Sequence, residues 1–153
     1  MAGELLAALN QLKTDVAAIS GVQRTQLGQA VDALPEATMD ECVAFVSLRS
    51  GGPENEALTS TTERHLVHLR FYWLLIPSTV ETVERSVATM WDLIMTKFFG
   101  SDADRNLTET STIALVGGEL GDLGYEALFE RIGNKLHRVL IVPIEIILNT
   151  HSV

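Results

Sequence analysis

Cysteine is nearly absent from this chain: Cys42 is the only one among 153 residues. A single cysteine excludes an intramolecular disulfide, and nothing else in the sequence calls for an oxidising compartment. Its neighbours Val43, Ala44 and Phe45 are apolar, and no basic partner that would activate a thiolate is evident nearby. We therefore expect Cys42 to be a core thiol and not a nucleophile.

Long apolar segments are also missing. The longest uninterrupted apolar run covers residues 71–76, whereas a membrane-spanning helix needs about 20 residues. The first six residues lack the basic region of a signal peptide. With 46% hydrophobic and 20% charged residues, the chain has the composition of a globular protein. We expect an intracellular, soluble protein with no membrane association and a single domain spanning residues 1–153.

Basic residues are scarce as well. Eleven lysines and arginines face 20 acidic residues, and the formal net charge of −9 argues against nucleic-acid binding by phosphate neutralisation. The charge is uneven, because residues 99–130 hold seven acids and one base, a net of −6. A solvated face would explain this stretch. In a ring, the same stretch would line a lumen that polyanions pass without sticking.

Known catalytic fingerprints are absent. The chain has no GxGxxG, no GxxxxGK[ST] and no GxSxG motif, and none of its many acids is placed in a recognisable acid/base pair. His65 and His68 are three residues apart, which on a strand puts them on opposite faces. His137 and His151 look incidental. We predict no catalytic residue, no cofactor-binding residue and no metal site.

The strongest structural pattern lies in residues 61–100. Residues 62–76 alternate as a strand, with Val67, Leu69, Phe71, Trp73 and Leu75 on one face. Residues 78–99 follow as a helix with an apolar stripe formed by Val80, Val83, Val87, Trp91, Ile94 and Phe98. Ser78 and Glu81 have the spacing of a capping box, and Gly100 suits a helix end. This pattern predicts a buried helix lying across a sheet.

The remaining elements are predicted around this unit. Residues 3–20 read as an amphipathic helix, residues 21–27 as a short polar strand and residues 40–49 as a central strand, with a possible helical turn before Pro35. Residues 108–116 and 136–148 read as strands, and Pro143 places the last of these at an edge or a bulge. Residues 119–135 are ambiguous between an irregular strand and a short helix at 125–132, with a turn at Gly133 and Asn134.

These elements predict an α+β fold, in which an antiparallel or mixed β-sheet packs against a long central helix and an N-terminal helix. Residues 50–60 contain Gly51, Gly52 and Pro53 and predict a mobile loop or a protruding hairpin arm. Long ordered loops in small domains often mediate contacts, so residues 50–60 are a candidate contact segment. Simple disorder explains the same residues equally well.

In order of elements and in size, the chain resembles the tail terminator proteins of long-tailed bacteriophages, also called tail-completion or tail-to-head joining proteins. The correspondence rests on the strand His65-Leu-Val-His-Leu-Arg-Phe-Tyr-Trp-Leu-Leu-Ile followed directly by the helix, and on the closing strand at 136–148. It covers nearly the whole chain, is carried by pattern without a signature motif, and fits residues 119–135 least.

The resemblance implies a structural virion protein at the head-proximal end of the tail, assembled in the host cytoplasm. It implies a homohexameric ring that stops polymerisation of the major tail tube protein and presents a surface to the head-completion protein, while DNA passes through without specific binding. Candidate subunit or tube contacts are Arg49, Glu54, Glu56, Asp102, Asp104 and Arg105. Candidate acidic lumen residues are Glu119, Asp122, Glu126 and Glu130.

Two other readings remain open. A hot-dog-like acyl thioesterase also wraps a sheet around a long helix, and it would need a catalytic carboxylate or amide at the helix N-terminus or at a dimer interface. Glu81 and Glu84 are the candidates there, although capping already accounts for Glu81. The third reading is a generic adaptor domain without a ligand.

Overall fold

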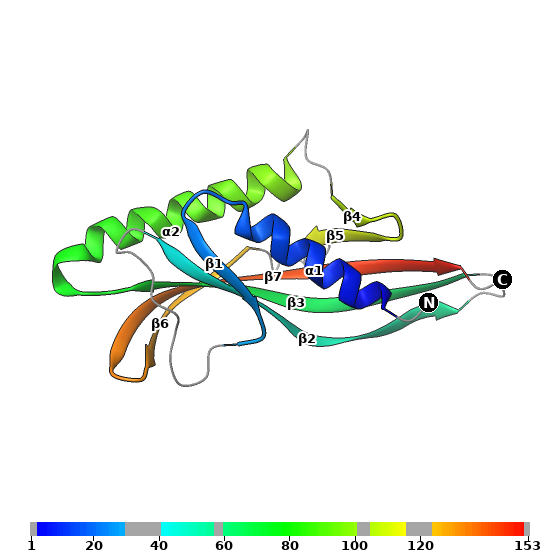
Figure 1. Ribbon diagram of the computed structural model, residues 1–153, viewed down its shortest axis with the longest axis horizontal. Coiled ribbons are helices and arrows are strands. Elements are labelled where there is room, and N and C mark those ends of the chain that lie inside the picture. Colours follow the sequence, from blue (N-terminus) through cyan, green and yellow to red (C-terminus); the bar gives the residue numbers. More distant parts are fainter. Residues whose placement is uncertain (1–2, 30–40, 57–59, 101–104, 116–123, 152–153) are drawn as a thin grey trace.

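The computed structural model describes residues 3–29, 41–56, 60–100, 105–115 and 124–151. Over these residues the chain is an α+β fold with two helices packed on a curled sheet (Figure 1). The elements in chain order are α1 (Glu4–Ala17), β1 (Val22–Leu27), β2 (Cys42–Glu56), β3 (Ser60–Leu74), a 3-10 turn (Pro77–Thr79), α2 (Val80–Ile94), a π-helical turn (Met95–Phe99), β4 (Asn106–Thr108), β5 (Ser111–Leu115), β6 (Glu126–Ile132) and β7 (Lys135–His151).

The sheet is mixed, which is one of the two predicted alternatives, antiparallel or mixed. Its strand order is β1-β2-β3-β7-β5-β4, and β6 also pairs with β7. β1 runs parallel to β2, and every other pairing is antiparallel. β3 lies between β2 and β7, and its pairing with β7 runs unbroken from Ser60 to Leu74. The centre of the sheet is therefore three long strands.

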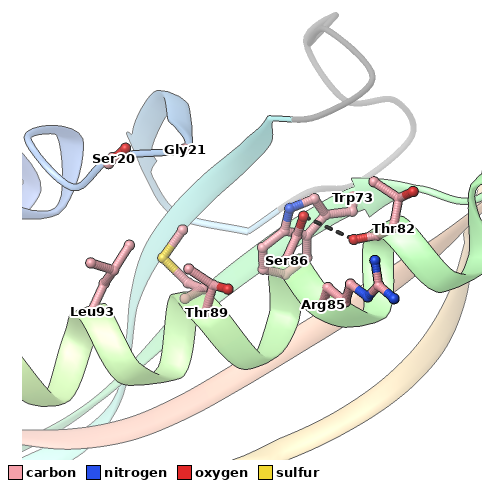
Figure 2. A pocket seen from close by; sticks show the side chains of 9 residues that line it. Ser20, Gly21, Trp73, Thr82, Arg85, Ser86, Thr89 and Leu93 are labelled. Atoms are coloured by element: carbon pink, nitrogen blue, oxygen red, sulfur yellow. Dashed lines mark hydrogen bonds between the residues drawn. The ribbon is translucent and has the colours of Figure 1, made fainter.

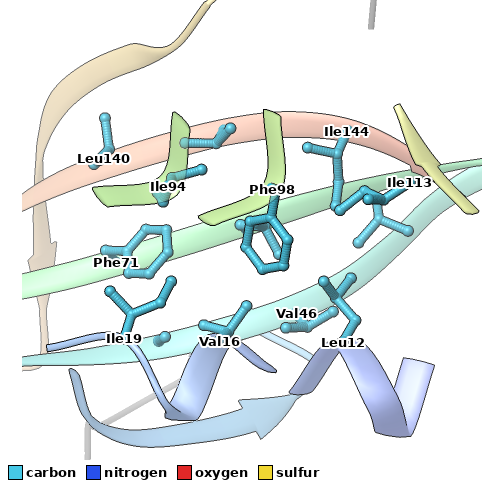
Figure 3. Close-up of a cluster of buried hydrophobic side chains, with 14 of the residues drawn as sticks. Leu12, Val16, Ile19, Val46, Phe71, Ile94, Phe98, Ile113, Leu140 and Ile144 are labelled. Atoms are coloured by element: carbon cyan, nitrogen blue, oxygen red, sulfur yellow. The ribbon is translucent and has the colours of Figure 1, made fainter. Parts of the chain in front are cut away.

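The main core lies between the sheet and the two helices, on what we call the helix face. The alternating residues of β3 predicted for this face are found there, with Val67, Leu69 and Phe71 fully buried. α1 contributes Leu12 and Val16 from one side, and the same cluster takes side chains from α2 and β7 (Figure 3). Both helices thus cover one face of the sheet.

The other side of the sheet, which we call the opposite face, has a smaller core. It consists of Val43, Phe45, Tyr72, Ile132, Val139 and Ile141, with Leu128 packed against it. The sheet curls at this end, where the β6–β7 hairpin turns away from the helices (Figure 1). The curl brings β6 residues over β3 and buries side chains that a flat sheet would leave in water.

The helix predicted at residues 78–99 is present, because helical turns run without a break from Pro77 to Phe99 and α2 (Val80–Ile94) is their α-helical part. The structure does not show it as a central helix, since α2 lies along one side of the sheet (Figure 1). Its buried residues are Val83, Val87, Met90 and Ile94, whereas Glu81, Glu84 and Arg85 are exposed. One apolar stripe allows a helix to cover a sheet but not to be enclosed by it.

Details at the start of this helix also differ from the prediction. The chain is already helical at Pro77, so Ser78 lies inside the first turn, and neither helical segment has a side-chain cap of the predicted Ser78–Glu81 kind. The Thr79 hydroxyl instead accepts a hydrogen bond from the Ile76 N–H at 3.2 Å. Glu81 pairs with Arg85 at 2.6 Å, and Val80 is 53% exposed.

Residues 50–60 are largely strand. β2 continues through Gly51, Gly52 and Pro53 to Glu56, and β3 begins at Ser60, so the two form a long hairpin (Figure 1). The register of the β2–β3 ladder shifts between Leu48 and Ser50 and between Pro53 and Asn55, as at β-bulges. The hairpin arm is thus the correct one of the two predicted forms, and a mobile loop over the whole segment is wrong. Its tip at residues 57–59 lies outside the described residues.

The C-terminal half settles two further predictions. Residues 126–132 form strand β6 and not a short helix, and Gly133 and Asn134 form the predicted turn before β7. Pro143 is neither at an outer strand nor at a bulge with β3, because it pairs in register with His68. On the other side of β7, the pairing with β6 ends at Ile141 and the pairing with β5 begins at Ile144. Pro143 falls between them, where no strand of the described residues needs its missing N–H.

The helix at residues 3–20, the strand at 21–27 and the strand at 40–49 are confirmed as α1, β1 and the first part of β2. The predicted strand at 108–116 is divided into β4 and β5 by a turn at Glu109 and Thr110. The predicted turn before Pro35 lies outside the described residues.

Candidate functional site

The predicted contact residues do not form one site. Arg49 is exposed on β2, at the bulge where the hairpin arm begins. Glu54 and Glu56 belong to β2 farther along the same arm. Arg105 is exposed just before β4, and its guanidinium lies 5.7 Å from the centre of the Phe99 ring. Asp102 and Asp104 lie outside the described residues.

The acidic lumen candidates are likewise divided. Glu126 and Glu130 both lie on β6, on the opposite face. Glu126 is exposed, whereas Glu130 is half-buried and pairs with Arg70 at 3.8 Å. Glu119 and Asp122 lie outside the described residues. At least one of the predicted lumen residues is therefore engaged within its own subunit.

The sequence did not reveal one group of buried and half-buried polar side chains. It consists of Arg70, Tyr72, Glu130 and His137 on the opposite face, and we call it the Arg70–Tyr72 cluster. The His137 ring meets the Tyr72 ring edge-on, with the ring centres 6.3 Å apart. The Tyr72 hydroxyl is buried without a hydrogen-bond partner among the described residues, and burial raises its pKa. Because Arg70 lies on β3 and Glu130 on β6, their ion pair ties the curled hairpin to the centre of the sheet.

Several atoms in and beside this cluster lack a hydrogen-bond partner. Among the described residues, Arg70 Nε, His137 Nδ1, Ser47 Oγ and His68 Nδ1 are buried and make no hydrogen bond. His68 lies opposite Ser47 in the β2–β3 ladder. Burial lowers the pKa of His68, and the charges of Arg49 and Arg70 lower it further. Burial and the two arginine charges together disfavour the charged imidazolium form of His68.

His137 gives a testable pH dependence. Burial lowers its pKa below the ordinary value, against a smaller opposite effect of a backbone hydrogen bond at Lys135. A folded pKa below the unfolded one means that the unfolded chain binds more protons, so stability is full above about pH 6.5 and falls as pH drops below it. We expect His137→Gln to flatten the fall in urea midpoint between about pH 7 and 5. An unchanged slope would contradict this role, with His65→Gln as control.

A cavity lies on the helix face, between α2 and the turn that precedes β1 (Figure 2). It has a volume of about 320 Å³ and is lined by Ser20, Gly21, Trp73, Thr82, Arg85, Ser86, Thr89, Met90 and Leu93. The Ser86 hydroxyl is already bonded to the Thr82 carbonyl at 3.1 Å, and Arg85 is paired with Glu81. Hydroxyl groups over an indole suit a small amphipathic group, but no acid and base converge on a common point there.

Cys42 lies at the start of β2 and is fully buried. Its thiol donates to the Gly21 carbonyl at 3.5 Å, and burial raises its pKa to about 12. We expect less than one equivalent in ten to react with a disulfide reagent at pH 8 in an hour, because few thiolates form. Denaturation in urea should then release one reactive thiol. Rapid labelling of the native protein would contradict the burial described here.

The carboxylates considered for a thioesterase lie outside the cavity. Glu84 accepts two hydrogen bonds from Arg138, at 3.0 and 3.1 Å, and Glu81 pairs with Arg85. For a metal, His65 contacts Glu63 at 3.2 Å, but the described residues contain no group of three or more His, Cys, Asp or Glu side chains that could hold an ion.

Among the described residues, no helix is both long and apolar enough to cross a membrane. The chain matches no protein-family model. No curated protein matches its sequence either.

Proposed function

We propose that this chain is a structural virion protein that forms a ring on the head-proximal end of a phage tail tube, ends tube polymerisation and joins the tail to the head-completion protein. The proposal rests on the resemblance of element order set out above. The observation that carries it furthest is the hairpin arm of β2 and β3, which extends beyond the N-terminal end of α1 (Figure 1).

The arm supports an assembly role for a physical reason. Its strands pair with each other and with the end of β7, as far as His151. Among the described residues, no strand pairs with the outer edge of β2 from Leu48 to Glu56, and such an edge presents N–H and C=O groups that pair readily with another chain. Placed on a ring, the arm reaches a neighbouring subunit or the tube.

Two measurements test this function. Electron microscopy of the purified chain should show closed rings, alone or after addition of the tube protein encoded by a neighbouring gene. The same chain, added to that tube protein as it polymerises, should shorten the tubes and mark one end of each. Tubes of unchanged length with no ring at either end would overturn the proposal, and hydrolysis of acyl thioesters by the purified chain would favour the enzyme reading.

A further inference from the structure

Besides the outer edges of the terminal strands β1 and β4, the sheet has two further edges on which the described residues place no strand. β1 covers β2 only as far as Val46, so the outer edge of β2 from Leu48 to Glu56 is one of them. The second is the outer edge of β6, which pairs with β7 on its other side. Unpaired strand edges present rows of N–H and C=O groups that pair readily with another strand.

The geometry points to pairing between these two edges: the outer edge of β6 in one copy of the chain adds to the outer edge of distal β2 in the next copy. The inference rests on the proposed function for the ring and adds to it the strands that join neighbouring subunits. The occupant of each edge is therefore a second copy of this chain.

Apolar side chains support this pairing on the helix face. Leu48 on β2 is 47% exposed and pairs with the buried Val67, so it points to the helix face. Phe129 on β6 is 61% exposed and lies two residues beyond Ala127, which pairs with the core residue Leu140. Each free edge thus carries one large exposed apolar side chain on the same face. Strand addition would bury both side chains as neighbours.

Charges support it on the opposite face. Glu126 on β6 is exposed and pairs in register with Ile141 of the smaller core. Arg49 on β2 is exposed, and its charge acts on His68 of the same face. Near the two exposed apolar side chains, β6 thus carries a carboxylate and β2 a guanidinium, whereas Glu54 and Glu56 lie farther along the β2 edge. Opposite charges on neighbouring strands favour the mixed pair.

The direction of the strands fits a head-to-tail arrangement. β2, β3, β7 and β6 alternate in direction, so a copy placed beyond β6 in the same orientation presents its β2 antiparallel to β6. β6 lies level with the start of β2, whereas the free edge of β2 is its distal half, so successive copies are offset along the strands. Such a stagger accompanies closure of sheets, and a head-to-tail contact that closes makes a ring.

A pair of engineered cysteines tests the contact. Under mild oxidation, Leu48→Cys with Phe129→Cys in one chain should give a ladder of disulfide-linked oligomers, because each link joins two different edges. The single variants should give no ladder, and the native Cys42 is too deeply buried to interfere. Covalent dimers from Phe129→Cys alone, or from Leu48→Cys alone, would overturn the inference in favour of symmetric edge pairing.

Charge reversal gives a second test in the intact chain. Arg49→Glu and Glu126→Arg should each weaken self-association by roughly three- to tenfold in sedimentation experiments, and the double variant should recover most of the loss. Lys97→Glu is the matched control for Arg49→Glu, since it also replaces a positive charge by a negative one, at an exposed position on the π-helical turn. Equal losses in all three single variants would overturn the inference.

The two proposals can fail separately. Rings that cap tubes, with no ladder from the double-cysteine chain, would leave the function standing and remove the β6–β2 contact. A ladder from a chain that leaves tube length unchanged would do the reverse. A chain that stays monomeric, forms no ladder and caps no tube would overturn both.

Discussion

Phe71→Ala is expected to lower the free energy of unfolding by about 3–5 kcal/mol, the largest effect of any single substitution proposed for this chain. Phe71 is fully buried at the centre of the helix face and lies between Ala44 of β2 and Leu140 of β7 (Figure 3). Ala44 is small, so it cannot fill the space that the ring would leave. A loss of this size is a large part of the stability of an ordinary domain.

Urea unfolding followed by circular dichroism measures this loss. The matched control is Phe129→Ala, the same change at a residue that is 61% exposed and stacked on Arg138 at 4.4 Å. That variant should lose less than about 1 kcal/mol. Similar losses at the two positions would show that Phe71 is not the centre of the core.

Gly51→Ala should destabilise the chain by about 1–3 kcal/mol and loosen the hairpin arm. A Cβ atom at this position would meet the His65 ring and would lie 2.8 Å from the Arg64 carbonyl oxygen. The ring can turn away, but the carbonyl belongs to the paired strand, so β2 and β3 must move apart. Gly51 is therefore required for close approach of the strands.

The adjacent Gly52→Ala is the control. Nothing lies within 4 Å of a Cβ atom there, and neither glycine has a positive φ. An alanine in a strand loses less conformational entropy than glycine on folding, so this variant should be neutral or slightly more stable. Hydrogen exchange of the β2–β3 amides would separate the two variants. Equal exchange rates in both would contradict the close approach at Gly51.

The long strands could be predicted because apolar and polar residues alternate along them with the two-residue period of a strand. The alternation in β3 identifies the helix face correctly, and Val83, Val87, Ile94 and Phe98 are buried as expected. Met90 is buried in their midst although it was not part of the predicted stripe. An apolar stripe shows that one side of a helix is buried. It does not show whether other parts of the protein also cover the opposite side of the helix.

Segments decided by distant partners could not be predicted. Residues 125–132 hold good helix formers such as Glu126, Ala127 and Leu128, and only pairing with β7 makes them a strand. Gly51, Gly52 and Pro53 signal a break, yet the ladder with β3 carries the strand through them. Local propensity yields in both places to pairing across the sheet.

The candidate site was the least predictable part. His137 looked incidental because the sequence shows only that it lies in a strand. It does not show that the sheet curls and buries the side chain. The curl is what brings Glu130 of β6 to Arg70 of β3, residues that are far apart in the sequence. Conversely, Arg49 was predicted as a contact and Glu126 as a lumen residue, and the structure places them on two separate edges that no other strand of the described residues covers.

The central position of β3 has a consequence for biosynthesis. One of its edges is completed at once by β2, but the other awaits β7, whose residues 135–151 are translated last among the described elements. Until they leave the ribosome, β3 keeps an open edge and the core lacks Leu140, Ile144 and Ile146. Folding must then wait for contacts of long sequence separation, which slows it and leaves an unpaired strand edge exposed in the nascent chain.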